Sequence, residues 1–390
     1  MSSVKFLEKL LDGVAVEWKP LGKVLVRTKG TAITAGQMKE LHKDGAPLKI
    51  FAGGRTVAFV DFDDIPAKNV NREQSIIVKS RGVIEFEYYD KPFSHKNEMW
   101  SYHSKNDNIH IKYVYHFLKL NEPYFQGIGS KMQMPQIATP DTDKFEIPIP
   151  CPGNPQKSLE IQAEIARILD AFTELTAELT AELTAELNLR KKQYNYYRDQ
   201  LLSFEGAVEW KTLGSILTMK AGQHLSASRI SDVASDGFIY PCFGGNGVRG
   251  YVKEKSHSGE YLLVGRQGAL CGNVQRMKGD FYATEHAVVV TVGEDVNVDF
   301  AFHMLTLMNL NQYASQSAQP GLAVGKLEGL KMPVPSLAEQ VRIAGILDKF
   351  DALTNSLTEG LPREIELRQK QYAYYRDLLL SFPKPEEAAA

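Results

Sequence analysis

The stretch FTELTAELTAELTAELNLRKKQYNYYRDQLLSF, from Phe172 to Phe204, decides the architecture of this chain. It holds three tandem TAEL units, Thr176 to Leu187, followed by a basic tail rich in tyrosine. The wider segment from Leu159 to Phe204 has no proline or glycine and is dominated by good helix formers. Apolar residues recur in it at helical spacing, which predicts one long helix. At 1.5 Å per residue, such a helix extends roughly 65–70 Å, far beyond one small domain.

The chain repeats itself, and this tail is one of the repeated parts. LRKKQYNYYRDQLLSF returns as LRQKQYAYYRDLLLSF, and ILDAF returns as ILDKF, both pairs 178 residues apart. VEWKPLG near the N-terminus returns as VEWKTLG, and IPIPCP returns as MPVP. Each half therefore reads as a VEW-x-x-LG start, a variable segment, a proline-marked exit and a long helical segment.

The second helical segment differs from the first by the interruption EGLPREIE, where Gly360 and Pro362 predict a break or kink. Apolar stripes in both copies favour two helices that pack antiparallel as a spacer over a lone solvated helix. Joining the C-terminal LLLSF to the N-terminal LLDGVAVEW would recreate the central LLSFEGAVEW junction. This circular pattern predicts approximate two-fold symmetry and termini that meet in space.

The variable segments have the glycine turns and β-branched or aromatic alternation of short strands, and KYVYHFLKL, from Lys112, indicates a helix. We therefore expect an α+β fold: two mixed α/β domains in pseudo-two-fold arrangement, separated by two long antiparallel helices. The predicted segments are an N-terminal part that completes the circular repeat (1–21), the first domain (22–150), the central helical spacer (151–206), the second domain (207–335), the C-terminal helical spacer (336–382) and a disordered tail (383–390).

The bulk composition is that of an ordinary cytoplasmic protein of two or more domains, with 390 residues, 43% hydrophobic and 24% charged. The sequence shows neither a membrane span nor a signal peptide. Its three cysteines lack CxxC spacing, which argues against a disulfide framework and a zinc site. The net charge of −2 means that any nucleic-acid binding must rely on local basic patches or on partners.

Together the duplicated VEWK-x-LG, the PxP-to-ILDxF entry, the YxYYRDxLLSF tails and the TAEL units resemble the DNA-specificity subunit of a type I restriction–modification enzyme, in its type IC branch. The resemblance covers nearly the whole chain and is weaker in the first variable segment, where GGRTVAFV replaces the glycine-rich turn. It implies a non-catalytic, cytoplasmic protein whose two target-recognition domains each read half of a split double-stranded DNA site. It also implies that the helices dock two modification (methyltransferase) subunits, and that restriction (motor-nuclease) subunits join them. S-adenosylmethionine, ATP and Mg²⁺ are then expected on these partners, with no cofactor or metal on this chain.

The TAEL repeat has a physical interpretation within that resemblance. Four helical residues add about 6 Å and about 400°, a net rotation of roughly 40°. One base pair of B-DNA rotates by about 34–36° and rises by about 3.4 Å. One TAEL unit thus moves a recognition domain by approximately one base-pair step, and the resemblance implies that the copy number sets the length of DNA between the two half-sites. The repeat residues that carry this prediction are Thr176, Leu179, Thr180, Leu183, Thr184 and Leu187.

Three short motifs resemble sites of other protein classes, and the long helices alone would also fit a scaffold protein. FGGNG at Phe243 resembles an S-adenosylmethionine loop and NEPYF at Asn121 an adenine-methyltransferase motif, but VRGYV after the first is strand-like and Glu122 replaces a proline. GLAVGK at Gly321 lacks the spacing of a phosphate-binding loop. A self-contained DNA adenine methyltransferase and a coiled-coil scaffold without base readout remain the alternatives.

The candidate DNA contacts are residues whose side chains suit guanine, adenine or phosphate and which lie in the variable segments. In the first domain they are Arg55, Lys79, Arg81, Lys96, Lys105, Gln133 and Gln136. In the second they are Asn246, Arg249, Tyr251, Arg266, Gln267 and His286, with Gln316 and Gln319 added by the resemblance.

Overall fold

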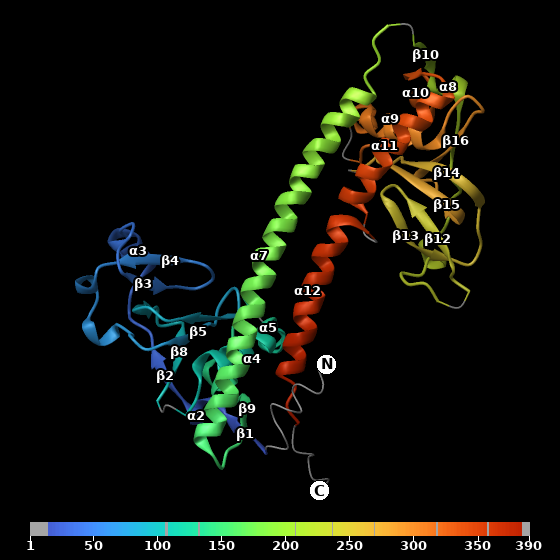
Figure 1. The fold of residues 1–390 in the computed structure, drawn as a ribbon. Coiled ribbons are helices and arrows are strands. Elements are labelled where there is room, and N and C mark those ends of the chain that lie inside the picture. Colours follow the sequence, from blue (N-terminus) through green and yellow to red (C-terminus); the bar gives the residue numbers. More distant parts are fainter. Residues whose placement is uncertain are drawn as a thin grey trace. The chain divides into compact units, whose positions relative to one another are not determined.

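A computed structural model describes residues 15–105, 108–131, 133–206, 208–235, 237–268, 270–316, 319–356 and 359–383. The chain divides into two compact units (Figure 1). Unit 1 comprises Met1–Thr180 and Leu367–Ala390, and unit 2 comprises Ala181–Glu366. Each unit has its own hydrophobic core.

Unit 1 contains two sheets and a two-stranded ribbon. The ribbon pairs β1 (Val16–Pro20) with β9 (Glu146–Pro150). The four-stranded sheet has the order β2 (Leu25–Lys29), β8 (Trp100–Ser104), β5 (Ser75–Lys79) and β6 (Glu85–Tyr89). The three-stranded sheet has the order β4 (Val57–Val60), β3 (Leu48–Phe51) and β7 (Phe93–His95). The helices are α2 (Leu21–Val24), α3 (Ala35–Leu41), α4 (Ile111–Leu120), α5 (Glu122–Gly129) and α6 (Thr139–Asp143), with 3₁₀ turns η1 (Phe62–Asp64) and η2 (Ala67–Asn69).

Unit 2 repeats this plan with one continuous sheet. Its ribbon pairs β10 (Glu209–Thr212) with β17 (Lys331–Val334). The six-stranded sheet has the order β11 (Leu217–Ala221), β16 (Ala287–Val292), β14 (His257–Gly265), β15 (Val274–Ala283), β12 (Tyr240–Gly244) and β13 (Gly247–Val252). The helices are α8 (Leu213–Ile216), α9 (Val298–Leu307) and α10 (Val324–Glu328), with 3₁₀ turns η3 (Ala227–Arg229) and η4 (Leu310–Tyr313).

The two units correspond strand for strand, because their pairings match. β8 lies between β2 and β5 just as β16 lies between β11 and β14. β3 pairs in parallel with β7, and β12 pairs in parallel with the end of β15. The one difference is that β15 runs unbroken where unit 1 has two strands, β6 and β7. The predicted mixed α/β domains are therefore confirmed, and so is the helix at KYVYHFLKL, which is α4.

Three helices complete the units. α7 (Pro155–Leu201) is continuous through the TAEL repeat, as its composition predicts. α11 (Leu337–Asn355) and α12 (Gly360–Leu379) are separate helices, so the break predicted at EGLPREIE is confirmed. Gly360 has a φ of +76°, a conformation that favours glycine at this junction.

Each unit pairs the start of its own helical segment with the tail of the other half's segment. In unit 1, Phe172 of α7 stacks on Tyr375 of α12, with ring centroids 5.5 Å apart, and Thr173 hydrogen-bonds Tyr372 at 3.0 Å. In unit 2, Phe350 of α11 stacks on Tyr197 of α7 at 5.6 Å. The paired helices run in opposite directions within each unit (Figure 1).

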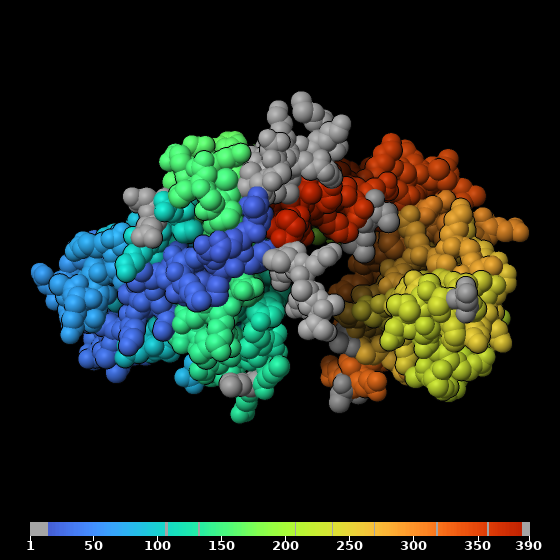
Figure 2. Space-filling model, turned by 90° about the horizontal axis from the view of Figure 1, so that it is seen from below, coloured from blue at the N-terminus to red at the C-terminus, as the bar shows by residue number. Residues whose placement is uncertain are grey.

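The described ends of the chain meet inside unit 1. The Trp18 indole N–H donates to the Pro383 carbonyl oxygen at 2.9 Å, and Phe382 packs edge-on against Tyr113. Figure 2 shows the blue start of the described chain beside its red end. At the central junction Phe204 packs in the same way on Phe300. This agrees with the circular pattern, while residues 1–14 and 384–390, which include most of the N-terminal segment and the tail, lie outside the described residues.

Candidate nucleic-acid interface

In unit 2, four segments meet at one end of the sheet, and we call them recognition surface 2. They are the β12–β13 tip (Gly244–Gly247), the residues after β14 (266–268), the turn Thr284–His286 and the described part of the exit loop (314–316 and 319–321). Backbone hydrogen bonds join three of them: Arg266 N–H donates to His286 O at 2.8 Å, and Gly268 N–H donates to Pro320 O at 3.0 Å. The loops are therefore held as a single framework.

The fourth segment, the β12–β13 tip, is held by a glycine contact. A Cβ added at Gly245 would lie 2.4 Å from the Gln267 carbonyl oxygen, and one added at Gly265 would lie 2.0 Å from the Gly245 oxygen. Real Cβ atoms essentially never approach so closely, so both positions require glycine. This explains the glycine-rich FGGNG stretch in packing terms.

Most of the predicted contacts of the second domain lie together on this surface. The His286 Nδ1 lies 2.6 Å from the Gln267 Oε1, and Asn246 Oδ1 accepts a hydrogen bond from Asn273 Nδ2 at 3.1 Å. Arg266 donates to the Glu285 carbonyl oxygen at 3.4 Å. Amide groups such as those of Asn246 and Gln267 can hydrogen-bond the edge of an adenine.

Arg249 and Gln316 complete the predicted set at its edge. Both are exposed, Arg249 on β13 beside Gly244 and Gln316 in the exit loop. Gln319 is exposed in the same loop. Tyr251 lies farther along β13, where its backbone pairs with Ser231, and is half-buried.

Acid and imidazole groups sit side by side on recognition surface 2. Glu285 Oε1 lies 2.7 Å from His224 Nδ1 and 3.6 Å from His286 Nε2. Burial raises the pKa of the Glu285 carboxyl, but hydrogen bonds from its own backbone N–H and from His224 outweigh it and keep the pKa below its usual value. The ionised carboxylate thus holds His224 by a hydrogen bond and lies beside His286, which contacts Gln267.

Unit 1 builds the same framework, recognition surface 1, from equivalent segments. They are the β3–β4 tip (Ala52–Thr56), the residues after β5 (80–82), the turn Lys96–Glu98 and the exit loop (133–137). Gly82 N–H donates to Pro135 O at 2.9 Å, which matches the bond from Gly268 to Pro320 in unit 2. Ile137 N–H donates to Ser80 O at 3.0 Å, which matches the bond from Leu322 to Arg266. Ser80 Oγ donates to Glu98 O, where Arg266 N–H donates to His286 O.

The same backbone positions carry different side chains in the two surfaces. Arg81 stands where unit 2 has Gln267, since both residues bridge to the exit loop. Glu98 stands where unit 2 has His286, and Lys96 is ion-paired with it at 2.9 Å. Arg55, Arg81, Gln133 and Gln136 are exposed on surface 1. The two surfaces therefore share a scaffold and differ in chemistry.

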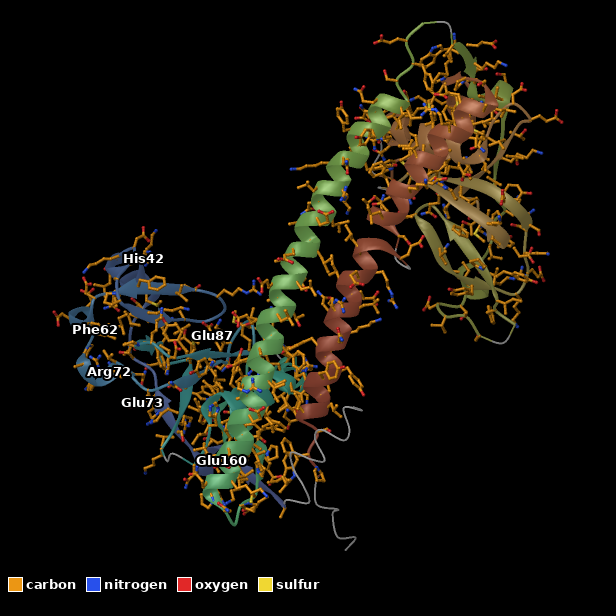
Figure 3. All side chains as sticks on the ribbon, in the orientation of Figure 1. His42, Phe62, Arg72, Glu73, Glu87 and Glu160 are labelled. Atoms are coloured by element: carbon orange, nitrogen blue, oxygen red, sulfur yellow. The ribbon has the colours of Figure 1, made fainter. Side chains whose placement is uncertain are left out.

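Lys79 is not on recognition surface 1, contrary to expectation. It is 6% exposed, and its ammonium lies 2.6 Å from Glu85 and 2.8 Å from Glu87 (Glu87 is labelled in Figure 3). A cation buried and doubly paired in this way is a structural group, because exposing it would break its ion pairs with two carboxylates. Lys105 is exposed but follows the far end of β8 from the turn Lys96–Glu98.

Sequence reasoning missed Glu98, Asn273, His224 and Glu285. Asn273 and Glu285 lie in stretches close to predicted residues and His224 does not, but only strand pairing shows that they converge. Glu98 lies two residues from the predicted Lys96, but its equivalence to His286 depends on the matching parallel bridges Thr31–Lys96 and Gln223–Thr284.

The rival motifs have structural explanations. FGGNG lies in the β12–β13 hairpin and does not open a helix. The Glu122 carboxylate of NEPYF accepts hydrogen bonds from Phe86 N–H at 2.7 Å and from Lys119 at 2.7 Å, so it fastens α5 to β6. No helix in the described part of the chain combines the length and hydrophobicity needed to cross a bilayer.

Comparisons with known proteins agree with this geometry. A family model described as the type I restriction modification DNA specificity domain matches residues 33–189 and 207–367, once in each half. The specificity subunit of the type I restriction enzyme EcoprrI of Escherichia coli is 52% identical over 383 residues, with 92% of this chain and 93% of that protein covered. The EcoR124I/EcoR124II specificity subunit of Escherichia coli is 39% identical over 410 residues, covering 99% of each.

A solved structure shares the fold. The S subunit of a type I restriction–modification system from M. genitalium superposes with a TM-score of 0.59 at 16% identity, covering 96% of this chain and 98% of that one. With two family matches and close relatives over nearly its full length, the chain belongs to the family of type I restriction–modification specificity subunits, the non-catalytic components of those enzymes.

Proposed function

We propose that this subunit reads a split double-stranded DNA site, with one half-site on each recognition surface. The observation that carries this is the duplicated loop framework with different side chains at matching positions. A conserved scaffold fixes where side chains meet the base edges, and the exchanged residues decide which bases they accept. Arg81 suits guanine, whereas Gln267 suits adenine, so the two half-sites differ in sequence.

The local charge of the surfaces supports DNA binding by a chain with a net charge of −2. Arg55 and Arg81 on surface 1, and Arg249 and Arg266 on surface 2, place cations where the loops converge. Most of the charge that neutralises phosphates would come from the partner subunits, so the isolated chain binds weakly and with strong salt dependence.

The helices would dock two modification subunits, because two large apolar side chains that are exposed in one copy are exposed at the equivalent positions of the other. Tyr196 is 62% exposed and its equivalent Tyr374 is 56% exposed; Leu189 is 66% exposed and Leu367 is 41% exposed. Large apolar side chains at matching exposed positions are typical of two equivalent protein-binding faces. These partners would bring S-adenosylmethionine for adenine methylation, and the restriction subunits would bring ATP and Mg²⁺.

The spacer between the half-sites would be set by the TAEL repeat in α7. Because α7 is helical throughout the repeat, removing one unit removes about 6 Å and rotates one end by roughly 40°. That rotation is close to the twist of one base pair.

Adenine-methylation mapping in a methylation-free bacterium tests the proposal. The chain is co-expressed with a type IC modification subunit, once intact and once without residues 180–183, with Glu178→Gln as a length-preserving control in the repeat. We expect a split motif in all three, with a spacer one base pair shorter only in the deletion. An unsplit motif, or methylation without the partner, contradicts the proposal.

A further inference from the structure

Each recognition domain is fastened to its spacer helix by a buried polar joint. In unit 1 the joint involves the start of α4 and Gln162 of α7, which is 0% exposed. The Gln162 Oε1 accepts the N–H of His110 at 3.0 Å, and its amide nitrogen donates to Asn108 O at 3.3 Å and to Ser158 Oγ at 3.0 Å. One glutamine therefore caps the first turn of the domain's helix.

A second contact lies two helical turns farther along α7. The Asp170 carboxylate accepts hydrogen bonds from Lys112 at 2.7 Å and from His116 Nε2 at 2.8 Å. Burial lowers the pKa of His116 and outweighs the opposite effect of Asp170, so the imidazole is neutral and donates its Nε2 proton. Polar joint 1 is thus formed by Gln162 and Asp170 from α7, with Lys112 and His116 from α4.

Unit 2 repeats this joint at the equivalent positions, 178 residues later on the helix. The Gln340 Oε1 accepts the N–H of Asn297, the N-cap of α9, at 2.8 Å, and its amide donates to Asp295 O and Pro335 O. Asp348 lies 2.9 Å from His303 Nε2, and Arg276 of β15 also donates to it. Polar joint 2 is formed by Gln340, Asp348, His303 and Arg276.

The hydrogen bonds of each polar joint restrict the rotation of the domain on its spacer helix more than the surrounding apolar packing does. Ile165 and Leu169 share one hydrophobic core with residues of α4, and Ile343 and Leu347 share another with residues of α9, but apolar contact is non-directional and permits small rotations. Hydrogen bonds weaken steeply when they bend. Two such contacts eight residues apart, about 12 Å along the helix, fix both the direction and the rotation of α4 against α7.

We propose that the two joints are positioning devices for spacer measurement, in which Gln162 with Asp170 and Gln340 with Asp348 hold each domain at one rotation about its helix. The inference rests on the proposed function, because a rotation of roughly 40° per TAEL unit specifies a spacer only if the domain cannot swivel by a comparable angle. A domain free to swivel would accept spacers that differ by one base pair.

The test compares Asp170→Asn, Asp348→Asn and the double variant, each assembled with modification subunits. The substrates are duplexes with the spacer mapped for the intact chain and with one base pair more or fewer. We expect the rate of methylation at the wrong spacers, relative to the right one, to rise by roughly tenfold per joint, the factor that one charged hydrogen bond contributes. The half-site sequences stay unchanged.

Glu164→Gln and Glu339→Gln are matched controls, since each carboxylate is ion-paired with an arginine three residues along its own helix. Asp170→Glu and Asp348→Glu keep the charge and should restore discrimination in part. If the Asn variants do not assemble, His116→Gln and His303→Gln weaken the same bonds more gently and carry the same comparison.

The outcomes separate the two claims. If the intact chain shows no split site, the proposed function fails. If the intact chain shows a fixed spacer and the joint variants lower all rates equally, the joints are merely structural and the positioning role is overturned.

Discussion

Replacing Gly245 by alanine tests the glycine contact that holds the β12–β13 tip on recognition surface 2. The added Cβ would lie 2.4 Å from the Gln267 oxygen, and ordinary contact begins at 3.4 Å, so the tip must retreat by about 1 Å. The hydrogen bond between Asn246 and Asn273, now 3.1 Å long, would then be lost. Overpacking of this kind costs about 1–3 kcal/mol.

Unit 1 supplies the matched control. Gly53 occupies the position of Gly245, but a Cβ there would meet its nearest atom, Glu98 Oε1, only at 3.8 Å. Gly53→Ala should therefore leave folding and recognition unchanged or stabilise the chain by about 0.4–1 kcal/mol.

The assay is methylation by the assembled enzyme of duplexes altered in one half-site at a time, together with thermal unfolding. Gly245→Ala should lower discrimination at the unit 2 half-site by roughly tenfold and leave the other half-site intact, because 1.4 kcal/mol corresponds to that factor. The reasoning is refuted if Gly245→Ala keeps both its melting temperature and its discrimination, or if Gly53→Ala is the more damaging change.

Three further predictions concern stability. Leu169→Ala and Leu347→Ala remove equivalent, fully buried side chains and should each cost about 2–5 kcal/mol in denaturant unfolding; a large difference between them would contradict the equivalence of the units. Lys79→Met should lower the free energy of unfolding by about 2 kcal/mol, because it leaves Glu87 without its closest cation. The bases that are recognised should stay the same, and an altered base preference would show that Lys79 belongs to the DNA interface after all. Burial lowers the pKa of His95 to about 4 from 6.5. The free energy of unfolding is therefore unaffected by this histidine above pH 6.5 and falls by roughly 3 kcal/mol as the pH drops toward 4, because the unfolded chain takes up the proton first. A His95→Gln variant should show a flatter unfolding free energy across that window, and parallel curves would refute the assignment.

The helices and the duplication were predictable because their signals are local and long. A segment without proline or glycine in strong helix formers has one favourable state, and α7 follows it closely. Gly360 and Pro362 likewise predicted the break between α11 and α12. The antiparallel pairing of the two segments was predicted, but the individual contacts were not, since the partner of Tyr375 lies far away in sequence.

The recognition surfaces were predictable in part. Glycine turns and arginines marked the loops correctly, but composition does not reveal whether a cation is exposed. Lys79 is a charged residue at the end of an otherwise largely apolar strand, but the strand is buried throughout and two glutamates on β6 pair with its ammonium. Glu98 was missed because the pairing that brings it to the surface joins strands distant in sequence.

The discontinuity of unit 1 has a consequence for synthesis. Unit 2 comes from one uninterrupted segment, whereas unit 1 needs the helix tail that begins at Leu367. At roughly 5–20 residues per second, a ribosome takes roughly 10–40 s to pass from Thr180 to Leu367. During that interval Phe172 and Tyr113 lack the tail residues that pack on them. The globule that emerges first from the ribosome is thus the last to be completed.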